Sequence, residues 1–334
     1  MSDSTKTVTQ PAEMPAAQVS ASDAQASAAP HEPRSIDLAS ETLERRREAR
    51  EGERVAGELR GQKARGWAER LLTRTTSGVT YAAVVLACLF WGRVPTAVLV
   101  TAMAWLCCSE FFRMTRMLGR MPNEVLGLAG AALYPLVALA KPGATSAVTL
   151  LLMIAVGAWF VLTPRANISD ASVTVFGAAY TGLLFSAVVT IRSANHGFEG
   201  ALLTIGVMGS VWLNDATAYL VGSRLGRHKL APRISPNKSW EGLWGGIVGS
   251  CIVWLILAAL GTCGVTLPLA LVGGILCAVA GVVGDLFESR LKRAAGVKDS
   301  GNLIPGHGGM LDRSDSMLFA CMTAYFVLYF GGIL

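Results

Sequence analysis

The stretch "LPLALVGGILCAVAGVVGDLFESRLKR", residues 267–293, decides the fold that we predict for this chain. Residues 267–284 carry no charged side chain, and a helix of about 20 apolar residues crosses the hydrocarbon core of a bilayer. Asp285 follows directly, and Glu288 lies three residues later on about the same helix face. The stretch therefore predicts a membrane-spanning helix with two acidic residues at its end.

The same alternation of apolar runs and short charged segments extends over most of the chain. Apolar residues make up 52% of the sequence and charged residues only 16%, unlike a soluble domain. Apolar runs near the length of a membrane span occupy residues 76–92, 94–112, 124–140, 145–163, 171–191, 201–222, 243–262, 266–287 and 316–334. We therefore predict an all-α integral membrane protein with about nine transmembrane helices. The small residues of "GGIVG" (245–249) favour close helix packing.

Basic residues predict how these helices are oriented. The first residues are polar and lack the pattern of a signal peptide, so we expect a cytoplasmic N-terminus. Loops after even-numbered helices are then cytoplasmic, and the last helix leaves the C-terminus outside. Those loops hold most basic residues of the membrane region, as the positive-inside rule requires: Arg113, Arg116, Arg120, Arg165, Arg224, Arg227, Lys229, Arg233, Lys238, Arg290, Lys292, Arg293, Lys298 and Arg313. The net charge of +6 fits a face against anionic lipid better than a nucleic-acid-binding surface.

Composition divides the chain into three regions. Residues 1–75 form an N-terminal cytoplasmic extension, expected to be disordered and then partly helical. Residues 76–200 hold the N-terminal membrane helices, and residues 201–334 form the C-terminal catalytic membrane region. The seven cysteines contain no C-x-x-C pair and are expected to be small buried hydrophobic residues.

Acidic residues inside or beside apolar runs are the first candidates for a functional site, because charge in a membrane span is costly. Asp215 lies about two turns before the end of its run, and Asp285 ends the run quoted above. Asp312 and Asp315 lie three residues apart at the start of the last span and can share one side of its first turn. The alternatives are a neutralised buried acid for Asp215, an interfacial pair for Asp285 with Glu288, and a helix cap at Asp312.

A glycine-rich loop precedes the last span. Gly306, Gly308 and Gly309 flank His307, and glycines allow close backbone approach and leave N–H groups for phosphate oxygens. The basic residues nearby are Lys292, Arg293, Lys298 and Arg313. Carboxylates that suit Mg²⁺, together with these phosphate contacts, indicate phosphoryl or nucleotidyl transfer.

A second polar loop, "RISPNKSWEG" (233–242), carries further phosphate-binding candidates. Arg233 and Lys238 supply charge, and Ser235 and Ser239 supply hydroxyl groups. The alternative is a basic loop that only sets the topology. A Walker-type nucleotide motif is absent from the sequence.

The run S-R-L-K-R-x-x-x-x-K-D-x-G-x-x-I-P-G-H-G-G-M-x-D-R-S-D, from Ser289 to Asp315, closely resembles the signature of the phosphatidate cytidylyltransferases. "SPNKSWEG" (235–242), "ND" (214–215) and "GD" (284–285) are also similar to that family's pattern, whereas Ser314 and Asn237 depart from it. The resemblance implies transfer of CMP from CTP to phosphatidic acid, which yields CDP-diacylglycerol and pyrophosphate during phospholipid synthesis. The bacterial plasma (inner) membrane is the expected location.

The resemblance also implies roles for individual residues. The expected metal ligands are Asp285, Asp312 and Asp315, with Asp215 as a further ligand or support. Mg²⁺ is the expected cofactor, and a second cation stays open. The expected substrate-binding residues are Ser235, Lys238, Ser239, Lys292, Arg293, Lys298, Gly308, Gly309 and Arg313. Three roles stay open for His307: it could donate a proton, form a hydrogen bond to phosphate or organise the loop.

Two rival functions share some of these features. A CTP-dependent kinase for an isoprenoid alcohol would also need a nucleotide loop, but the full signature from Ser289 to Asp315 argues against it. An ion-coupled transporter would use Asp215 and Asp285 near the midplane, whereas this sequence concentrates polar residues in two loops. The expected partners are CTP, phosphatidic acid and membrane lipids, without nucleic acid, and a homodimer stays open.

Overall fold

The computed structural model describes residues 51, 75–141, 143–303 and 308–334, and the structural statements below concern this part of the chain. The chain divides into two units, Met1–Ala64 and Arg65–Leu334, and all described residues except Glu51 belong to the second. The structure predicted for the N-terminal extension therefore lies almost entirely outside the described residues, as do Gly306 and His307.

The second unit is built from helices and one small hairpin. The helices are Thr75–Trp91, α2 (Arg93–Met117), α3 (Glu124–Ala140), α4 (Thr145–Leu162), α5 (Ile168–Ala178), α6 (Leu184–Arg192), α7 (Phe198–Leu225), α8 (Trp240–Ala259), α9 (Leu267–Ala294) and α10 (Asp315–Phe330). A π-helical segment, η1 (Ala179–Leu183), joins α5 to α6, and short 3-10 turns lie at η2 (Thr262–Gly264) and η3 (Leu311–Arg313). The hairpin strands are β1 (Lys229–Ala231) and β2 (Ser235–Ser239).

Five helical segments among the described residues are long and apolar enough to cross a membrane: α2, α4, the run Ile168–Arg192, α8 and α9. Three apolar helices are shorter, namely Thr75–Trp91, α3 and α10. The predicted helical architecture is confirmed at this level, because each of the nine expected ranges overlaps a helix and five helical segments could cross a membrane. That all nine cross the bilayer stays a prediction.

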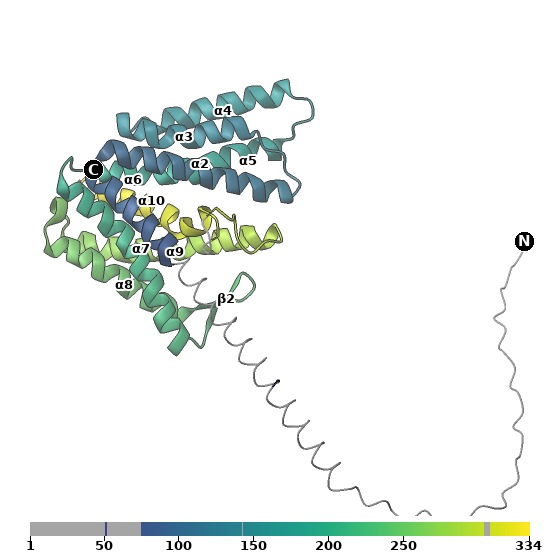
Figure 1. The fold of residues 1–334 in the computed structure, drawn as a ribbon. Helices are drawn as coiled ribbons and strands as arrows, with labels where there is room; N and C mark the ends of the chain where they lie inside the picture. The colour runs from purple at the N-terminus through teal and green to yellow at the C-terminus, as the bar shows by residue number, and fades with distance from the viewer. Residues whose placement is uncertain (1–50, 52–74, 142, 304–307) are drawn as a thin grey trace, which may run out of the picture. The chain divides into compact units, whose positions relative to one another are not determined.

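The helices pack in two groups that meet at α10 (Figure 1). Helix α3 contacts α2, α4, α5 and α6, whereas α7, α8 and α9 follow one another by contact. Helix α10 packs against α9 and also contacts α6 and α7. The expected close packing at "GGIVG" is confirmed, because a Cβ atom at Gly246 would lie 2.2 Å from Asn214 Oδ1 on α7.

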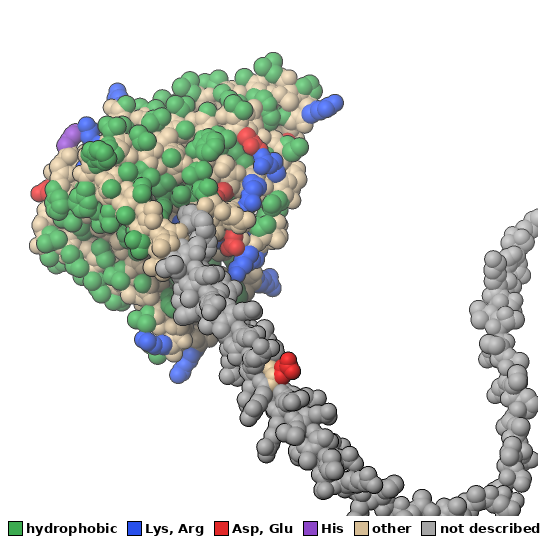
Figure 2. All heavy atoms as spheres, in the orientation of Figure 1, with side chains coloured by type: hydrophobic (Ala, Val, Ile, Leu, Met, Phe, Trp, Pro, Cys, Tyr) green, Lys and Arg blue, Asp and Glu red, His purple; other side chains and the backbone are tan. Residues whose placement is uncertain are grey.

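The loops that follow α2, α7 and α9, and the loop that precedes α5, gather at one end of the helices. Arg120 after α2 donates to Ser169 Oγ at 3.1 Å, and Arg113 near the end of α2 donates to the Ser300 carbonyl oxygen. Lys238 in the hairpin contacts Asp285 near the end of α9. Charged side chains are concentrated on the side where α2 and α9 end, and apolar side chains cover most of the remaining visible surface (Figure 2). We name this side the polar end; which compartment it faces stays a prediction.

Candidate active site

A pocket of about 580 Å³ opens at the polar end beside the hairpin. The hairpin is antiparallel, with Lys229 opposite Ser239 and Ala231 opposite Ser235. Its base is fixed where Glu241 accepts hydrogen bonds from the N–H groups of Arg227 and His228. The pocket is lined by residues of α7, the hairpin, α8 and α9: Asp215, Ala218, Tyr219, Gly222, Ser223, Gly226, Lys229, Leu230, Asn237, Lys238, Ser239, Gly242, Leu243, Val282 and Asp285.

Three carboxylates from three helices converge beside this pocket, and we call Asp215, Asp285 and Asp315 the acidic cluster. Asp315 interacts electrostatically with both Asp285 and Asp215, and Asp215 interacts with Asp285. Helices α9 and α10 approach closely here, because a Cβ atom at Gly284 would lie 2.4 Å from the Asp315 carbonyl oxygen. The fold therefore unites residues that lie as far as 100 positions apart in the sequence.

Specific donors surround this cluster. Lys238 Nζ lies 2.7 Å from Asp285 Oδ2, and Ser289 Oγ donates to Asp285 Oδ1 at 3.0 Å. The Ser316 N–H donates to Asp315 Oδ1 at 2.7 Å, and Lys238 also interacts electrostatically with Asp215. The alternative of an interfacial pair for Asp285 with Glu288 is wrong, because Glu288 is fully buried and forms an ion pair with Lys292 instead.

Asp312 belongs to a second network, built around Lys292. Lys292 Nζ lies 2.6 Å from Asp312 Oδ1, while the N–H groups of Ser300 and Gly309 each donate to Asp312 Oδ2 at 2.8 Å. Burial opposes ionisation of Asp312, but the hydrogen bonds from Lys292 and Gly309 outweigh it and lower the pKa of Asp312 to about 2. The cap alternative for Asp312 is wrong, because α10 begins at Asp315 with Ser314 as its N-cap.

Only some of the other residues predicted to bind substrate line the pocket. Ser239 and Lys238 line the pocket, and Ser239 Oγ also caps α8 by accepting from the Gly242 N–H at 3.1 Å. Arg293 and Lys298 are exposed, and Arg293 donates to the Val297 carbonyl oxygen. Gly308 has φ +84°, which favours glycine, and the Gly309 N–H is directed to Asp312.

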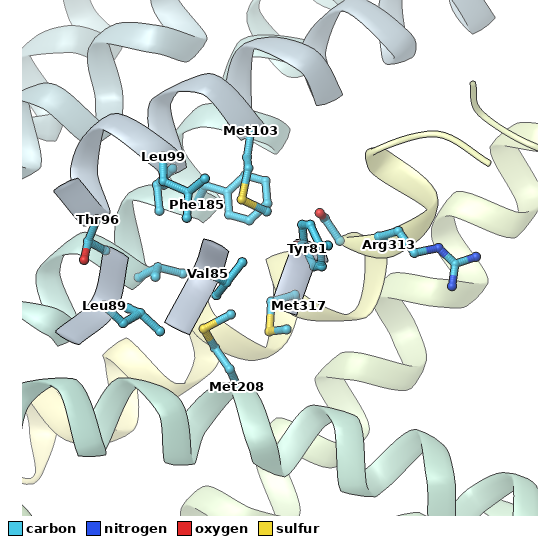
Figure 3. Close-up of a pocket in the computed structure, with 13 residues that line it drawn as sticks. Tyr81, Val85, Leu89, Thr96, Leu99, Met103, Phe185, Met208, Arg313 and Met317 are labelled. Atoms are coloured by element: carbon cyan, nitrogen blue, oxygen red, sulfur yellow. The ribbon is translucent and has the colours of Figure 1, made fainter. Parts of the chain in front are cut away.

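Arg313 is exposed at the polar end. A small void of about 20 Å³ lies beside its stem, lined mainly by apolar side chains of the helix Thr75–Trp91, α2, α6, α7 and α10. The guanidinium group of Arg313 points away from these side chains, among them Tyr81, Met103 and Met317 (Figure 3). The charged end of Arg313 is therefore separate from the void.

The acidic cluster is a candidate cation site by residue type alone. Its three carboxylates repel one another, and carboxylate oxygens are the protein ligands that Mg²⁺ prefers. Among the described residues, His, Cys, Asp and Glu side chains do not form a group of three or more in an arrangement that could hold a metal ion. The seven cysteines are free thiols, each buried or partly buried, as expected.

The sequence analysis missed Glu110 as a site residue and gave Arg113 only a role in topology. Glu110 lies on α2 and is 8% exposed, yet it accepts hydrogen bonds from the loop that precedes α10. The signal was available, because Glu110 is a lone acid within the apolar run 94–112.

Comparison with known proteins agrees with the geometry of this site. Carboxylates and lysines brought together at one end of apolar helices suit a membrane enzyme that acts on phosphate-containing substrates. Residues 72–330 match the model of the cytidylyltransferase family, and the chain belongs to that family. The resemblance drawn from the Ser289–Asp315 signature is therefore confirmed.

Individual relatives differ in how much of the chain they match. A phosphatidate cytidylyltransferase of Bacillus subtilis is 33% identical over 265 residues, which cover 76% of this chain and 96% of that protein. A phosphatidate cytidylyltransferase of Staphylococcus saprophyticus is 42% identical over 155 residues, which cover 46% of this chain. The match spans only 58% of the staphylococcal protein's length. An uncharacterized Escherichia coli protein, YnbB, is 46% identical over 131 residues.

Proposed function

We propose that this protein transfers CMP from CTP to phosphatidic acid and forms CDP-diacylglycerol and pyrophosphate. The observation that carries the proposal is the acidic cluster beside Lys238 at a pocket of about 580 Å³. The names of the B. subtilis and S. saprophyticus relatives support the same activity. The finer topology belongs to the proposal: nine spans, a cytoplasmic polar end and a C-terminus outside the bacterial inner membrane.

The chemistry that we propose needs no protein nucleophile. The phosphate monoester of phosphatidic acid is already anionic, and one of its oxygens forms a bond to the α-phosphorus of CTP. The bond between that phosphorus and the oxygen leading to the β-phosphate breaks, and pyrophosphate leaves with the electron pair. The protein therefore has to align two anions and stabilise charge on the leaving group.

Residues at the polar end suit these two tasks. Asp215, Asp285 and Asp315 would hold Mg²⁺, which when bound neutralises charge on phosphate oxygens. Lys238 Nζ lies 2.7 Å from Asp285 Oδ2, so it would also contact a phosphate group bound beside Asp285. Lys292, Arg293, Lys298 and Arg313 would supply positive charge from the end of α9 and the residues that follow it. Hydroxyl and N–H groups of Ser235, Ser239, Gly308 and Gly309 would be further contacts.

Asp312 takes a different place in this proposal. Both of its carboxylate oxygens have donors, and Lys292 is one of them. We therefore give Asp312 the role of holding Lys292 toward the acidic cluster. Direct binding of the metal by Asp312 stays a prediction, as do the role of His307, a second cation and a homodimer.

A labelling experiment tests the proposal. Protein in detergent micelles is given phosphatidic acid, Mg²⁺ and CTP labelled at either the α- or the γ-phosphate. We expect the α-label in a lipid product and the γ-label in released pyrophosphate. In a parallel assay that contains an isoprenoid alcohol, transfer of the γ-label to that alcohol would instead establish the kinase. With the protein in liposomes, proton-driven or sodium-driven uptake without either product would establish the transporter.

A further inference from the structure

The buried acid Glu110 has no part in the chemistry proposed above. It lies on α2, in the N-terminal half of the chain, and is 8% exposed. Burying a carboxylate costs several kcal/mol unless hydrogen bonds compensate for lost water. Its contacts show where that compensation comes from.

Glu110 accepts its hydrogen bonds from the segment that carries the family signature. The Met310 N–H donates to Oε1 at 3.0 Å and the Leu311 N–H donates to Oε2 at 2.9 Å. Ser300 Oγ also lies 2.9 Å from Oε2. One carboxylate on α2 therefore joins both ends of the segment between α9 and α10.

Ser300 connects Glu110 to Asp312. Its hydroxyl oxygen lies 2.9 Å from Asp312 Oδ2 as well, and its single proton can be donated to one carboxylate at a time. The Ser300 N–H donates to Asp312 Oδ2, and the Ser300 carbonyl oxygen accepts from Arg113, one turn after Glu110. Two residues of α2 thus fix Ser300, and Ser300 fixes Asp312.

Two glycines of the signature are shaped to admit the Glu110 carboxylate. A Cβ atom at Gly301 would lie 2.3 Å from Glu110 Oε1, and one at Gly309 would lie 2.4 Å from Oε2. Any larger residue at either position would displace the carboxylate or the loop. Part of the glycine content of this loop therefore serves Glu110, whereas the sequence suggested phosphate contacts.

The anchored segment leads directly into the proposed site. Leu311, whose N–H binds Glu110, begins η3, and Asp315 of the acidic cluster follows four residues later. Asp312 in the same turn contacts Lys292. The turn that Glu110 holds therefore leads to Asp315 of the acidic cluster and, through Asp312, to Lys292.

We propose that Glu110 is a positioning residue for nucleotidyl transfer, which it promotes by fixing Ser300 and the turn at Met310 and Leu311, and through them Asp315 and the Asp312–Lys292 pair. This inference rests on the proposed function. We call Glu110 and Arg113 the loop anchor.

Steady-state kinetics of the full chain in mixed micelles test the loop anchor. In Glu110→Ala we expect kcat to fall roughly 100-fold, since a shift of about 1 Å in a catalytic group costs about that much, with the KM for phosphatidic acid changed less than about threefold. Glu110→Gln keeps one acceptor oxygen and should lie between Glu110→Ala and the unaltered protein. A kcat within about threefold of normal in a folded Glu110→Ala or Glu110→Gln protein would overturn the proposal.

Asp170→Asn is the matched control. Asp170 is a buried acid at the same polar end, 4% exposed, and it accepts from the N–H groups of Met121 and Asn167 instead of the signature loop. We expect this variant to lose thermal stability while keeping its kcat. An equal loss of kcat in Asp170→Asn and Glu110→Gln would mean that any buried acid matters equally, which contradicts positioning.

Two further readouts separate positioning from general damage. Gly301→Ala alone should lower kcat, because its Cβ would displace the Glu110 carboxylate. In a protein that already carries Glu110→Ala, the same change should lower kcat less, because that carboxylate is absent. Hydrogen exchange at the Met310 and Leu311 amides should accelerate in Glu110→Gln, and this is measurable even if the protein forms no CDP-lipid. Unchanged hydrogen exchange at these two amides would contradict the loop-anchor proposal. Absence of CMP transfer by the unaltered protein would instead contradict the proposed function.

Discussion

The acidic cluster and the network around Asp312 are two groups of carboxylates at one end of the same helices, and they solve the problem of buried charge differently. Asp312 and Glu110 receive donors on both oxygens, from Lys292, Ser300 and backbone N–H groups. Asp285 also has a donor on each oxygen, from Lys238 and Ser289, but Asp215, Asp285 and Asp315 lie within electrostatic reach of one another, and Asp215 and Asp285 line a pocket. Mutual repulsion is costly within the acidic cluster, whereas the network around Asp312 and Glu110 gives a fixed frame.

The largest expected effect is the loss of a carboxylate from the acidic cluster. Asp315→Asn should reduce CMP transfer by roughly 10²–10³-fold, as removal of one electrostatic stabiliser does in other enzymes. Its thermal stability should hold or rise, because repulsion from Asp285 and Asp215 is relieved. Removal of Mg²⁺ with EDTA should have the same effect on the unaltered protein. A rate of CMP transfer within tenfold of normal in a folded Asp315→Asn protein would show that the acidic cluster does not take part in the reaction.

The next effect is on stability and concerns Lys292. Lys292→Met leaves the buried carboxylates of Glu288 and Asp312 without their shared cation, and breaking such a group costs about 3–5 kcal/mol. Denaturant unfolding in micelles measures the loss. The double variant with Glu288→Gln should recover part of it, because one buried charge is then removed. No recovery would show that the Lys292–Glu288 contact is unimportant.

A smaller effect separates two glycines of α9. An added Cβ at Gly284 would lie 2.4 Å from the Asp315 carbonyl oxygen, so Gly284→Ala should force α9 and α10 apart and cost about 1–3 kcal/mol. At Gly281 the nearest atom is 3.6 Å away, which is ordinary contact. Gly281→Ala, one turn earlier on the same helix, should be neutral or stabilising. Equal effects of both changes would contradict the close approach that brings Asp315 to the cluster.

The smallest effect tests the void beside Arg313. Val85→Ile adds one methylene toward a space of about 20 Å³, and filling that volume should raise the free energy of unfolding by about 0.5 kcal/mol. CMP transfer should not change, because the guanidinium group points away from the void (Figure 3). A lower rate of CMP transfer in Val85→Ile would show that packing around the void affects the proposed site.

Sequence reasoning located the helices well and the pairing of side chains poorly. The apolar runs predicted α3 and α8 to within three residues, because a bilayer requires length and hydropathy that a single sequence displays. Helices α2 and α9 continue five and seven residues past the ends of their predicted runs. The signature and the two "ND" and "GD" pairs identified the acidic residues. The π-helical segment η1 and the hairpin next to the pocket had no comparable signal.

What the sequence by itself determined is the class of fold and the set of charged residues at the polar end, since water and lipid sort residues by polarity alone. Only the tertiary structure decided which carboxylates share a pocket and which are bound by donors. Asp285 and Glu288 are three residues apart but bind different lysines, and Glu110 meets Leu311 across 201 positions. Such pairings depend on how helices approach one another, and that is set by packing at glycines such as Gly284 and Gly301.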